Sequence, residues 1–186
     1  MGAAIKRRRE PLTADEHQRA WAALCHDDTL TDIAYTIETE AWGAIRMRPT
    51  QARPARMAGR IARLLYQKLG GEAIPERALL TADGIKVPDV AWCSDTVLAQ
   101  HWSETALSKA PEICVEVVSP ANAEAALRAK TALDLNLGAL EVWLVALDGA
   151  VEIYTESGAR ADPTFGLEPA AELAGVIPLP GAVGAR

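Results

Sequence analysis

Two acidic residues stand where the sequence pattern favours apolar side chains. Glu116 interrupts the apolar run from Ile113 to Ser119, and Asp89 follows a proline in the run from Val87 to Cys93. An ionised carboxylate buried in such a strand without a partner would cost several kcal/mol. Two carboxylates on neighbouring strands also repel each other unless a cation or a shared proton lies between them. A hard cation with a preference for oxygen ligands, Mg²⁺ or Mn²⁺, is the simplest compensation.

Lys130 is a third residue of unusual placement. On a helix expected from Asn122 to Leu137, it lies in the middle of the apolar face. A lysine there can reach across the sheet towards an acidic site or extend its ammonium group to the rim. The simpler alternative is an ion pair with Asp134 one turn later, which would hold the ammonium group away from a metal. For Asp89 and Glu116, the simpler alternative is a pair of strand-end carboxylates that cap loops or bind arginines.

Four arginines form a stripe on another predicted helix, from Pro54 to Leu69. The segment from Trp42 to Gly71 has seven basic residues and no acidic one, although the whole chain has a net charge of −6. The segment from Glu141 to Glu172 has seven acidic residues against one arginine. The basic helix could therefore bind a polyanion, or it could be an ordinary solvated face. The arginine stripe comprises Arg53, Arg56, Arg60 and Arg63.

Two carboxylates, a lysine and a basic helix are the parts that metal-assisted hydrolysis of a phosphodiester requires. The remaining residues of ligand type, Cys25 to Asp28 and His101 with Trp102, have no partner at metal-ligand spacing, so we interpret them as helix-end and loop residues. Cys25, Cys93 and Cys114 are too far apart in sequence for a zinc-ligand pair and too few for a disulfide framework. We expect them to be buried thiols.

The coarse pattern predicts an α/β fold, with a mixed central sheet flanked by the Pro54 helix on one side and the Asn122 helix on the other. A capping box at Thr13 predicts an additional helix near the N-terminus. The predicted elements are helices at Ala14–Cys25, Pro54–Leu69 and Asn122–Leu137, and strands at Ile33–Thr39, Ala44–Met47, Ile74–Leu80, Val87–Cys93, Ile113–Ser119, Val142–Ala146, Ala150–Thr155 and Ala174–Ile177.

Length and composition bound the organisation of the chain. The 186 residues, 49% of them hydrophobic, suit one main domain, and no apolar run approaches the ~20 residues that span a bilayer. We expect an N-terminal arm and appended helix at 1–30, with residues Lys6–Arg9 disordered. The main domain should cover 31–180, with a tail at 181–186. The absence of an apolar leader favours a cytoplasmic location without membrane attachment.

The ordered motifs resemble the Uma-type restriction endonuclease family of the PD-(D/E)xK nuclease superfamily. They are Pro88-Asp89, Glu116-Val-Val-Ser-Pro120, Lys130 and Gly138-Ala-Leu-Glu-Val-Trp-Leu-Val145. The resemblance, from about residue 32 to 180, implies a restriction-endonuclease-like sheet. It also implies Asp89, Glu116 and the backbone carbonyl of Val117 as Mg²⁺ ligands. The superfamily lysine usually follows the glutamate by two residues, where this chain has Val118, and Lys130 matches the helical lysine that takes its place.

The resemblance extends to an N-terminal acidic strand, where Glu38, or with less support Glu40, could complete the site. The chain departs from the family where Arg53-Pro-Ala-Arg56 replaces a frequent histidine and Asp134 replaces a tyrosine. We therefore expect a Mg²⁺- or Mn²⁺-dependent DNA endonuclease that acts as a homodimer, with Lys130 orienting water or stabilising charge. The alternative is a non-catalytic nucleic-acid-binding or regulatory module that retains the fold.

Overall fold

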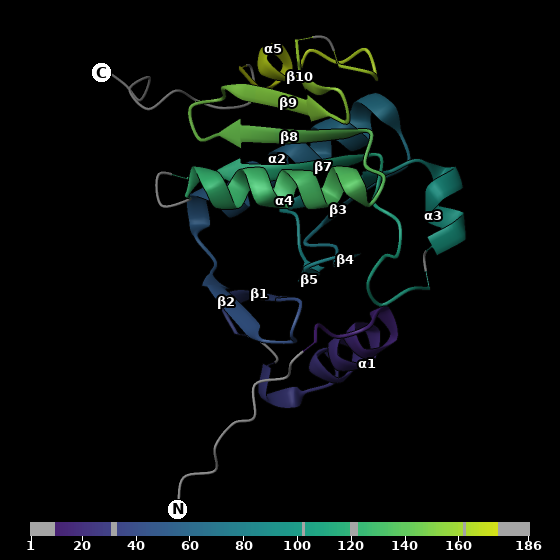
Figure 1. Cartoon of the computed structure of the whole chain (residues 1–186). Helices are drawn as coiled ribbons and strands as arrows, with labels where there is room; N and C mark the ends of the chain where they lie inside the picture. The colour runs from purple at the N-terminus through teal and green to yellow at the C-terminus, as the bar shows by residue number, and fades with distance from the viewer. Residues whose placement is uncertain (1–9, 31–32, 102, 120–122, 162, 175–186) are drawn as a thin grey trace, which may run out of the picture.

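The computed structural model describes residues 10–30, 33–101, 103–119, 123–161 and 163–174 (Figure 1). The predicted arm at Lys6–Arg9 and the tail at 181–186 lie outside these ranges. Of the short strand predicted at Ala174–Ile177, only Ala174 is described, and it is the last residue of helix α5 (Pro169–Ala174).

A six-stranded mixed sheet forms the centre of the molecule. The strand order is β10-β9-β8-β7-β6-β3, with β7 and β8 parallel and all other neighbours antiparallel. This arrangement confirms the predicted mixed central sheet. The strands are β3 (Glu72–Pro75), β6 (Val90–Cys93), β7 (Ile113–Val118), β8 (Glu141–Ala146), β9 (Val151–Thr155) and β10 (Gly158–Arg160).

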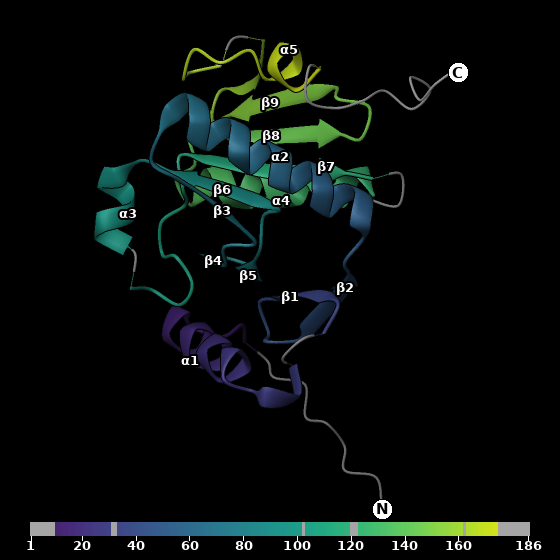
Figure 2. The same ribbon diagram turned by 180° about the vertical axis from the view of Figure 1, so that it is seen from behind.

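Helices cover both faces of this sheet, as Figures 1 and 2 show from opposite sides. Helix α2 (Ala52–Leu69) packs on one face, where its buried Ile61 and Leu65 join Val115 in the main core. Helix α4 (Glu124–Asn136) lies on the other face, near the cluster that contains Cys114. Since side chains alternate along a strand, Glu116 points to the same side as Cys114, towards α4. The predicted placement of one helix on each side is confirmed.

A smaller group of elements lies below the central sheet in Figure 1. Helix α1 (Ala14–Cys25) begins with the predicted capping box, and its Trp21 packs against Ile85 in a separate small core. The strands here form two hairpins, β1 (Tyr35–Thr39) with β2 (Ile45–Pro49) and β4 (Leu79–Thr81) with β5 (Gly84–Lys86). A 3₁₀ turn at Asp28–Leu30 and helix α3 (Asp95–His101) complete the described elements.

Two predicted strands are wrong in extent. The run Ile74–Leu80 divides into β3 and β4, because Pro75 is followed by Glu76 in a left-handed conformation (φ 53°) that turns the chain. The run Val87–Cys93 pairs in the central sheet only from Val90, because Pro88 has no amide hydrogen for the ladder. The residues that precede this run, Gly84–Lys86, form strand β5, which belongs to another sheet. The prolines therefore mark transfers between sheets.

The cysteine prediction is partly wrong, because Cys25 is exposed whereas Cys93 and Cys114 are buried. Cys25 is the last residue of α1, where the helix meets solvent. The interpretation of the histidines is consistent with the structure: His26 caps α1 and His101 ends α3. None of the helices in the described ranges combines the length and apolar character that crossing a membrane demands.

Candidate functional site

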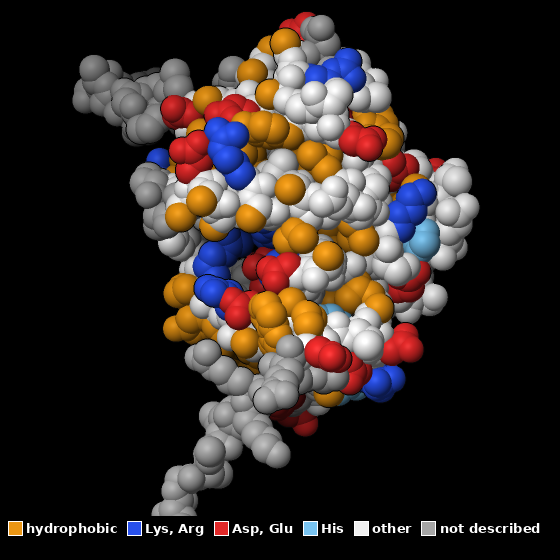
Figure 3. All heavy atoms as spheres, in the orientation of Figure 1, with side chains coloured by type: hydrophobic (Ala, Val, Ile, Leu, Met, Phe, Trp, Pro, Cys, Tyr) orange, Lys and Arg blue, Asp and Glu red, His pale blue; other side chains and the backbone are white. Residues whose placement is uncertain are grey.

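A cavity of about 550 Å³, with several charged side chains in its lining, lies between the central sheet and the smaller group of elements. Figure 3 shows it as a hollow below α4, with basic side chains around acidic ones. Strand β7, helix α4 and the two hairpins all contribute to its walls. Its charged lining residues are Glu38, Glu40, Arg46, Arg48, Asp83, Lys86, Glu116 and Lys130.

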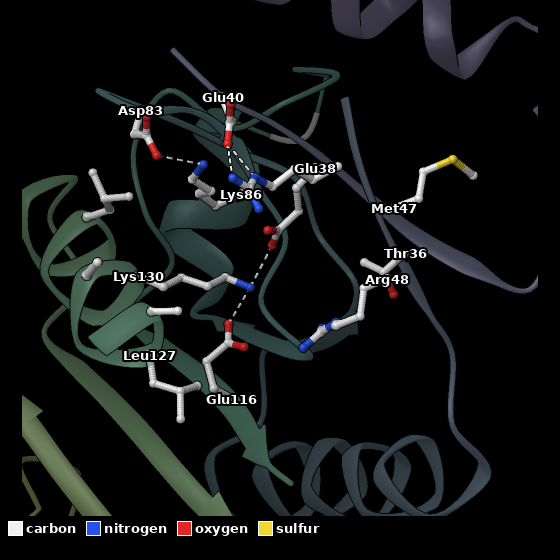
Figure 4. A pocket seen from close by; sticks show the side chains of 14 residues that line it. Thr36, Glu38, Glu40, Met47, Arg48, Asp83, Lys86, Glu116, Leu127 and Lys130 are labelled. Atoms are coloured by element: carbon white, nitrogen blue, oxygen red, sulfur yellow. Dashed lines mark hydrogen bonds and ion pairs between the residues drawn. The ribbon is translucent and has the colours of Figure 1, made fainter. Parts of the chain in front are cut away.

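Lys130 joins three separate segments at this cavity. Its Nζ lies 2.8 Å from Glu116 Oε1 and 2.7 Å from Glu38 Oε1. The same ammonium group donates a hydrogen bond to the Val87 carbonyl at 2.7 Å. Figure 4 shows Lys130 between the two carboxylates. We refer to Glu38, Glu116 and Lys130 as the Lys130 cluster.

The alternative pairing of Lys130 with Asp134 is therefore wrong. Asp134 is fully buried, and neither of its carboxylate oxygens has a hydrogen-bond partner in the described part of the chain. Burial raises the pKa of Asp134 to about 7, although the charge of Lys130 opposes the rise. Asp134 is thus an isolated buried acid near the cluster and does not hold the ammonium group.

Burial and opposite charge act against each other within the Lys130 cluster. The Glu116 side chain is 2% exposed, and burial raises its pKa to about 8 even though Lys130 opposes the shift. Burial alone would lower the pKa of Lys130, but Glu116 and Glu38 together raise it, so the ammonium group stays charged. Glu38 is half-buried, and although that burial would raise its pKa, Lys130 and the Val87 amide hold the pKa below the ordinary value.

Strand β5 determines the position of Glu38. The Val87 amide donates to Glu38 Oε1 at 2.9 Å, and the Ile85 amide donates to the Thr39 hydroxyl at 2.9 Å. Gly84 makes this approach possible: its φ is 87°, and a Cβ there would lie 2.7 Å from the Thr39 carbonyl oxygen. The resemblance left Glu38 and Glu40 open, and the structure places Glu38 against Lys130. Glu40 instead pairs with Arg46.

Asp89 lies next to the cluster but opens into a second cavity, of about 640 Å³. Its Oδ2 accepts a hydrogen bond from the Val117 amide at 2.7 Å, and its Oδ1 lies 3.1 Å from Nη2 of Arg48. Arg48 and Thr36 line both cavities. Val90 of β6 pairs with Val115 of β7. Asp89 comes directly before Val90 and Glu116 directly after Val115, so the two acids lie beside this pair. The charge of Asp89 contributes to the raised pKa of Glu116.

The donor chemistry around Asp89 and Glu116 suits a hard divalent cation. Both residues offer carboxylate oxygens at neighbouring strand positions, and the cations that balance them are the side chains of Arg48 and Lys130. Across the described residues, no group of three or more His, Cys, Asp or Glu side chains is arranged to hold a metal. The Mg²⁺ or Mn²⁺ site and the ligand role of the Val117 carbonyl therefore remain predictions.

The arginine stripe lies on the helix that borders the second cavity, which Pro54, Ala55, Ala58 and Gly59 of α2 line. Arg53, Arg56 and Arg63 are exposed and Arg60 is half-buried. None of the four makes an ion pair with another residue of the described ranges, and none lines either cavity. Its role in DNA binding stays a prediction.

Two basic residues of the site did not stand out in the sequence. Lys86 is buried, donates to the Thr39 carbonyl at 2.9 Å and lies 3.0 Å from Asp83 Oδ2. Arg48 pairs with Asp89. The sequence contains a pattern that could have indicated each residue. Lys86 interrupts an apolar run, between Ile85 and Val87. Arg48 belongs to a strand in which basic and apolar residues alternate.

The mixed sheet between two helices, with strand carboxylates beside a helical lysine, defines a restriction-endonuclease-like protein. The chain matches the Uma2 family, described as "Putative restriction endonuclease", over residues 23–183, and it belongs to that family. A solved structure from Anabaena variabilis ATCC 29413, described as a "putative nuclease belonging to DUF820", is similar in fold. The match has 16% sequence identity and a TM-score of 0.63, and it covers 88% of this chain and 99% of the other. No curated protein matches this chain.

Proposed function

We propose that this protein hydrolyses phosphodiester bonds of DNA with the help of Mg²⁺ or Mn²⁺. The observation that carries the proposal is the contact of the Lys130 ammonium group with Glu116 at the edge of an open cavity, beside Asp89. Buried charges of this kind are costly, so their convergence on a cavity favours a functional site over a purely structural one. Membership of a restriction endonuclease family supports the same reaction class.

The proposed roles follow from the position of each side chain. Asp89 and Glu116 would hold the metal, which when bound supplies Lewis-acid activation of water and of the phosphoryl oxygens. Lys130 stays charged beside Glu116, so it is placed to stabilise negative charge that develops on the phosphate or to orient the attacking water. Glu38 fixes the ammonium group from the other side.

The arginine stripe supplies a second reason to propose DNA as the substrate. Like charges three and four residues apart on a helix repel each other, and Arg53 lies in the first turn of α2, where the helix dipole disfavours a cation. These repulsions make the stripe unfavourable for the stability of α2 when no polyanion is bound. Phosphates of a nucleic acid would balance it.

A cleavage assay tests the proposal. Supercoiled plasmid is incubated with the protein in Mn²⁺, in Mg²⁺ and in EDTA, and relaxed and linear products are separated on a gel. We expect products with either metal and none in EDTA. The Glu116→Gln protein should be inactive, whereas Arg128→Gln should cleave normally because Arg128 is exposed and its ion-pair partner among the described residues is the exposed Glu124. If calorimetry detects no metal site and the plasmid stays intact, the protein is a non-catalytic module.

We also propose that the active form is a homodimer. Cutting both strands of a duplex calls for two active sites, and two-fold dimers are the commonest closed assemblies. Light scattering should give twice the 19.9 kDa chain mass. A monomer at all concentrations that still linearises plasmid would contradict the dimer and leave the hydrolase proposal intact.

A further inference from the structure

Arg48 occupies the boundary between the two cavities. In the β1–β2 hairpin, Thr36 pairs with Arg48 and Glu38 pairs with Arg46, so these four side chains share the face that lines the first cavity. Figure 4 shows the Arg48 side chain reaching from β2 towards Glu116 and Lys130. Its guanidinium group ends at Asp89, on the wall of the second cavity.

The two oxygens of Asp89 have different partners. Oδ2 accepts from the Val117 amide at 2.7 Å and thereby fixes the carboxylate against β7. Oδ1 faces Nη2 of Arg48 at 3.1 Å. A Mg²⁺ ion would bind Oδ1 at about 2.0 to 2.1 Å, and its charge would repel a guanidinium group on the same oxygen. A metal bound at this oxygen would therefore compete with Arg48 for Asp89.

The displaced side chain has room to move, although Glu76 and Glu116 also line the cavities that Arg48 borders. The Arg48 side chain is 44% exposed, every residue of β2 is exposed, and Asp89 is its one ion-pair partner among the described residues. The planar fork of a guanidinium group matches the oxygens of a phosphate. A phosphodiester entering either cavity would meet Arg48 at the boundary.

We propose that Arg48 is an exchangeable counter-ion of the site. It neutralises Asp89 before metal binds, and it transfers to a phosphate of the nucleic acid when metal takes its place. This inference rests on the proposed function, since it requires a metal at Asp89. It makes metal binding and nucleic-acid binding mutually strengthening, because each favours the same displaced position of Arg48.

Metal titration without nucleic acid tests the first half of the exchange. Mn²⁺ is titrated calorimetrically into the wild type, Arg48→Gln and Arg46→Gln. Arg46 lies on the same hairpin face but pairs with Glu40, so it is the matched control. We expect Arg48→Gln to bind Mn²⁺ about tenfold more tightly, as expected when a competing cation is removed, and Arg46→Gln to bind like the wild type. Unchanged or weaker binding by Arg48→Gln overturns the exchange.

Duplex binding tests the second half. Anisotropy of a fluorescein-labelled duplex is measured in EDTA and in Ca²⁺, under conditions in which a gel shows the duplex intact. Ca²⁺ should strengthen binding to the wild type and to Arg46→Gln. The gain should be largely lost in Arg48→Gln and partly restored in Arg48→Lys, which keeps the charge without the fork. An equal gain in all four proteins overturns the exchange, and thermal melts confirm that each variant is folded.

The results separate this inference from the function on which it rests. A wild type that binds Mn²⁺ and cuts plasmid, with an Arg48→Gln protein of unchanged metal affinity, overturns the exchange alone. A wild type that binds no metal overturns both.

Discussion

The Lys130 cluster and the arginine stripe place positive charge in opposite physical settings. Lys130 is 12% exposed in its side chain and touches carboxylates from β1 and β7, whereas three of the four stripe arginines are exposed on one helix. Removing one partner from a buried ion pair leaves an uncompensated charge, while an exposed charge is hydrated and screened. The cluster should therefore dominate stability and chemistry, and the stripe should act only through its attraction for the phosphates of a polyanion.

The largest effect is expected for Lys130→Ala. It leaves Glu38 and Glu116 without their shared cation, so the free energy of unfolding should fall by about 3 kcal/mol, and cleavage should fall at least about 100-fold. Metal binding should persist, because Lys130 is not a ligand. Denaturant melts, calorimetry and plasmid assays below the melting temperature measure the three quantities, with Arg128→Gln as the control on α4. Intact cleavage would remove Lys130 from the active site.

Glu116→Gln is expected to abolish metal binding and cleavage at a smaller cost in stability. Lys130 keeps Glu38 and the Val87 carbonyl, and an amide oxygen can still accept from it, so the loss should be within about 1.5 kcal/mol. Comparing the loss in the free energy of unfolding with that of Lys130→Ala shows which residue of the Lys130 cluster contributes most to stability. An equal or larger loss in Glu116→Gln would assign that role to the carboxylate.

Asp134→Asn should produce a smaller effect that depends on pH. The raised pKa of about 7 means that folded Asp134 is protonated where the unfolded carboxyl, with its ordinary value of 3.8, is ionised. The wild type therefore loses stability as pH rises from about 4 to 7, and Asn removes that loss. We expect similar melting temperatures at pH 4, and a variant at pH 8 that melts a few degrees higher, as about 1–2 kcal/mol predicts. A variant that is less stable at pH 8 would indicate a partner for the ionised carboxylate.

The smallest effect on stability is expected for replacement of Arg56, Arg60 and Arg63 by Gln. The free energy of unfolding should change by less than about 0.5 kcal/mol, as for surface positions. Duplex binding should weaken equally for different sequences, and the salt dependence should flatten by about one unit of slope for each lost phosphate contact. Unchanged binding with an unchanged slope would leave the stripe as a solvated face.

Local patterns were sufficient for most of the fold. The capping box at Thr13 and the apolar spacing of α2 predicted helices that the structure confirms, because capping and periodicity depend on neighbouring residues. The strand prediction from Ile74 to Leu80 is wrong because the run divides at the left-handed Glu76, and its two halves pair with different strands, β6 and β5. Helix α3 and helix α5 are short and were missed, since tertiary packing rather than local pattern stabilises helices of their length.

For the candidate site too, some features could be predicted from the sequence and others depend on the tertiary structure. By itself the sequence determined which residues were out of place: an acid in each of two apolar strands, and a lysine on the apolar face of a helix. Such anomalies are visible because burying a charge is costly whatever its partner. Only the tertiary structure decided the partners, namely Glu116 and Glu38 for Lys130 and Arg48 for Asp89. These residues are brought together by strand register and by the β5 contact with β1, which are long-range interactions that no local pattern of residue types encodes.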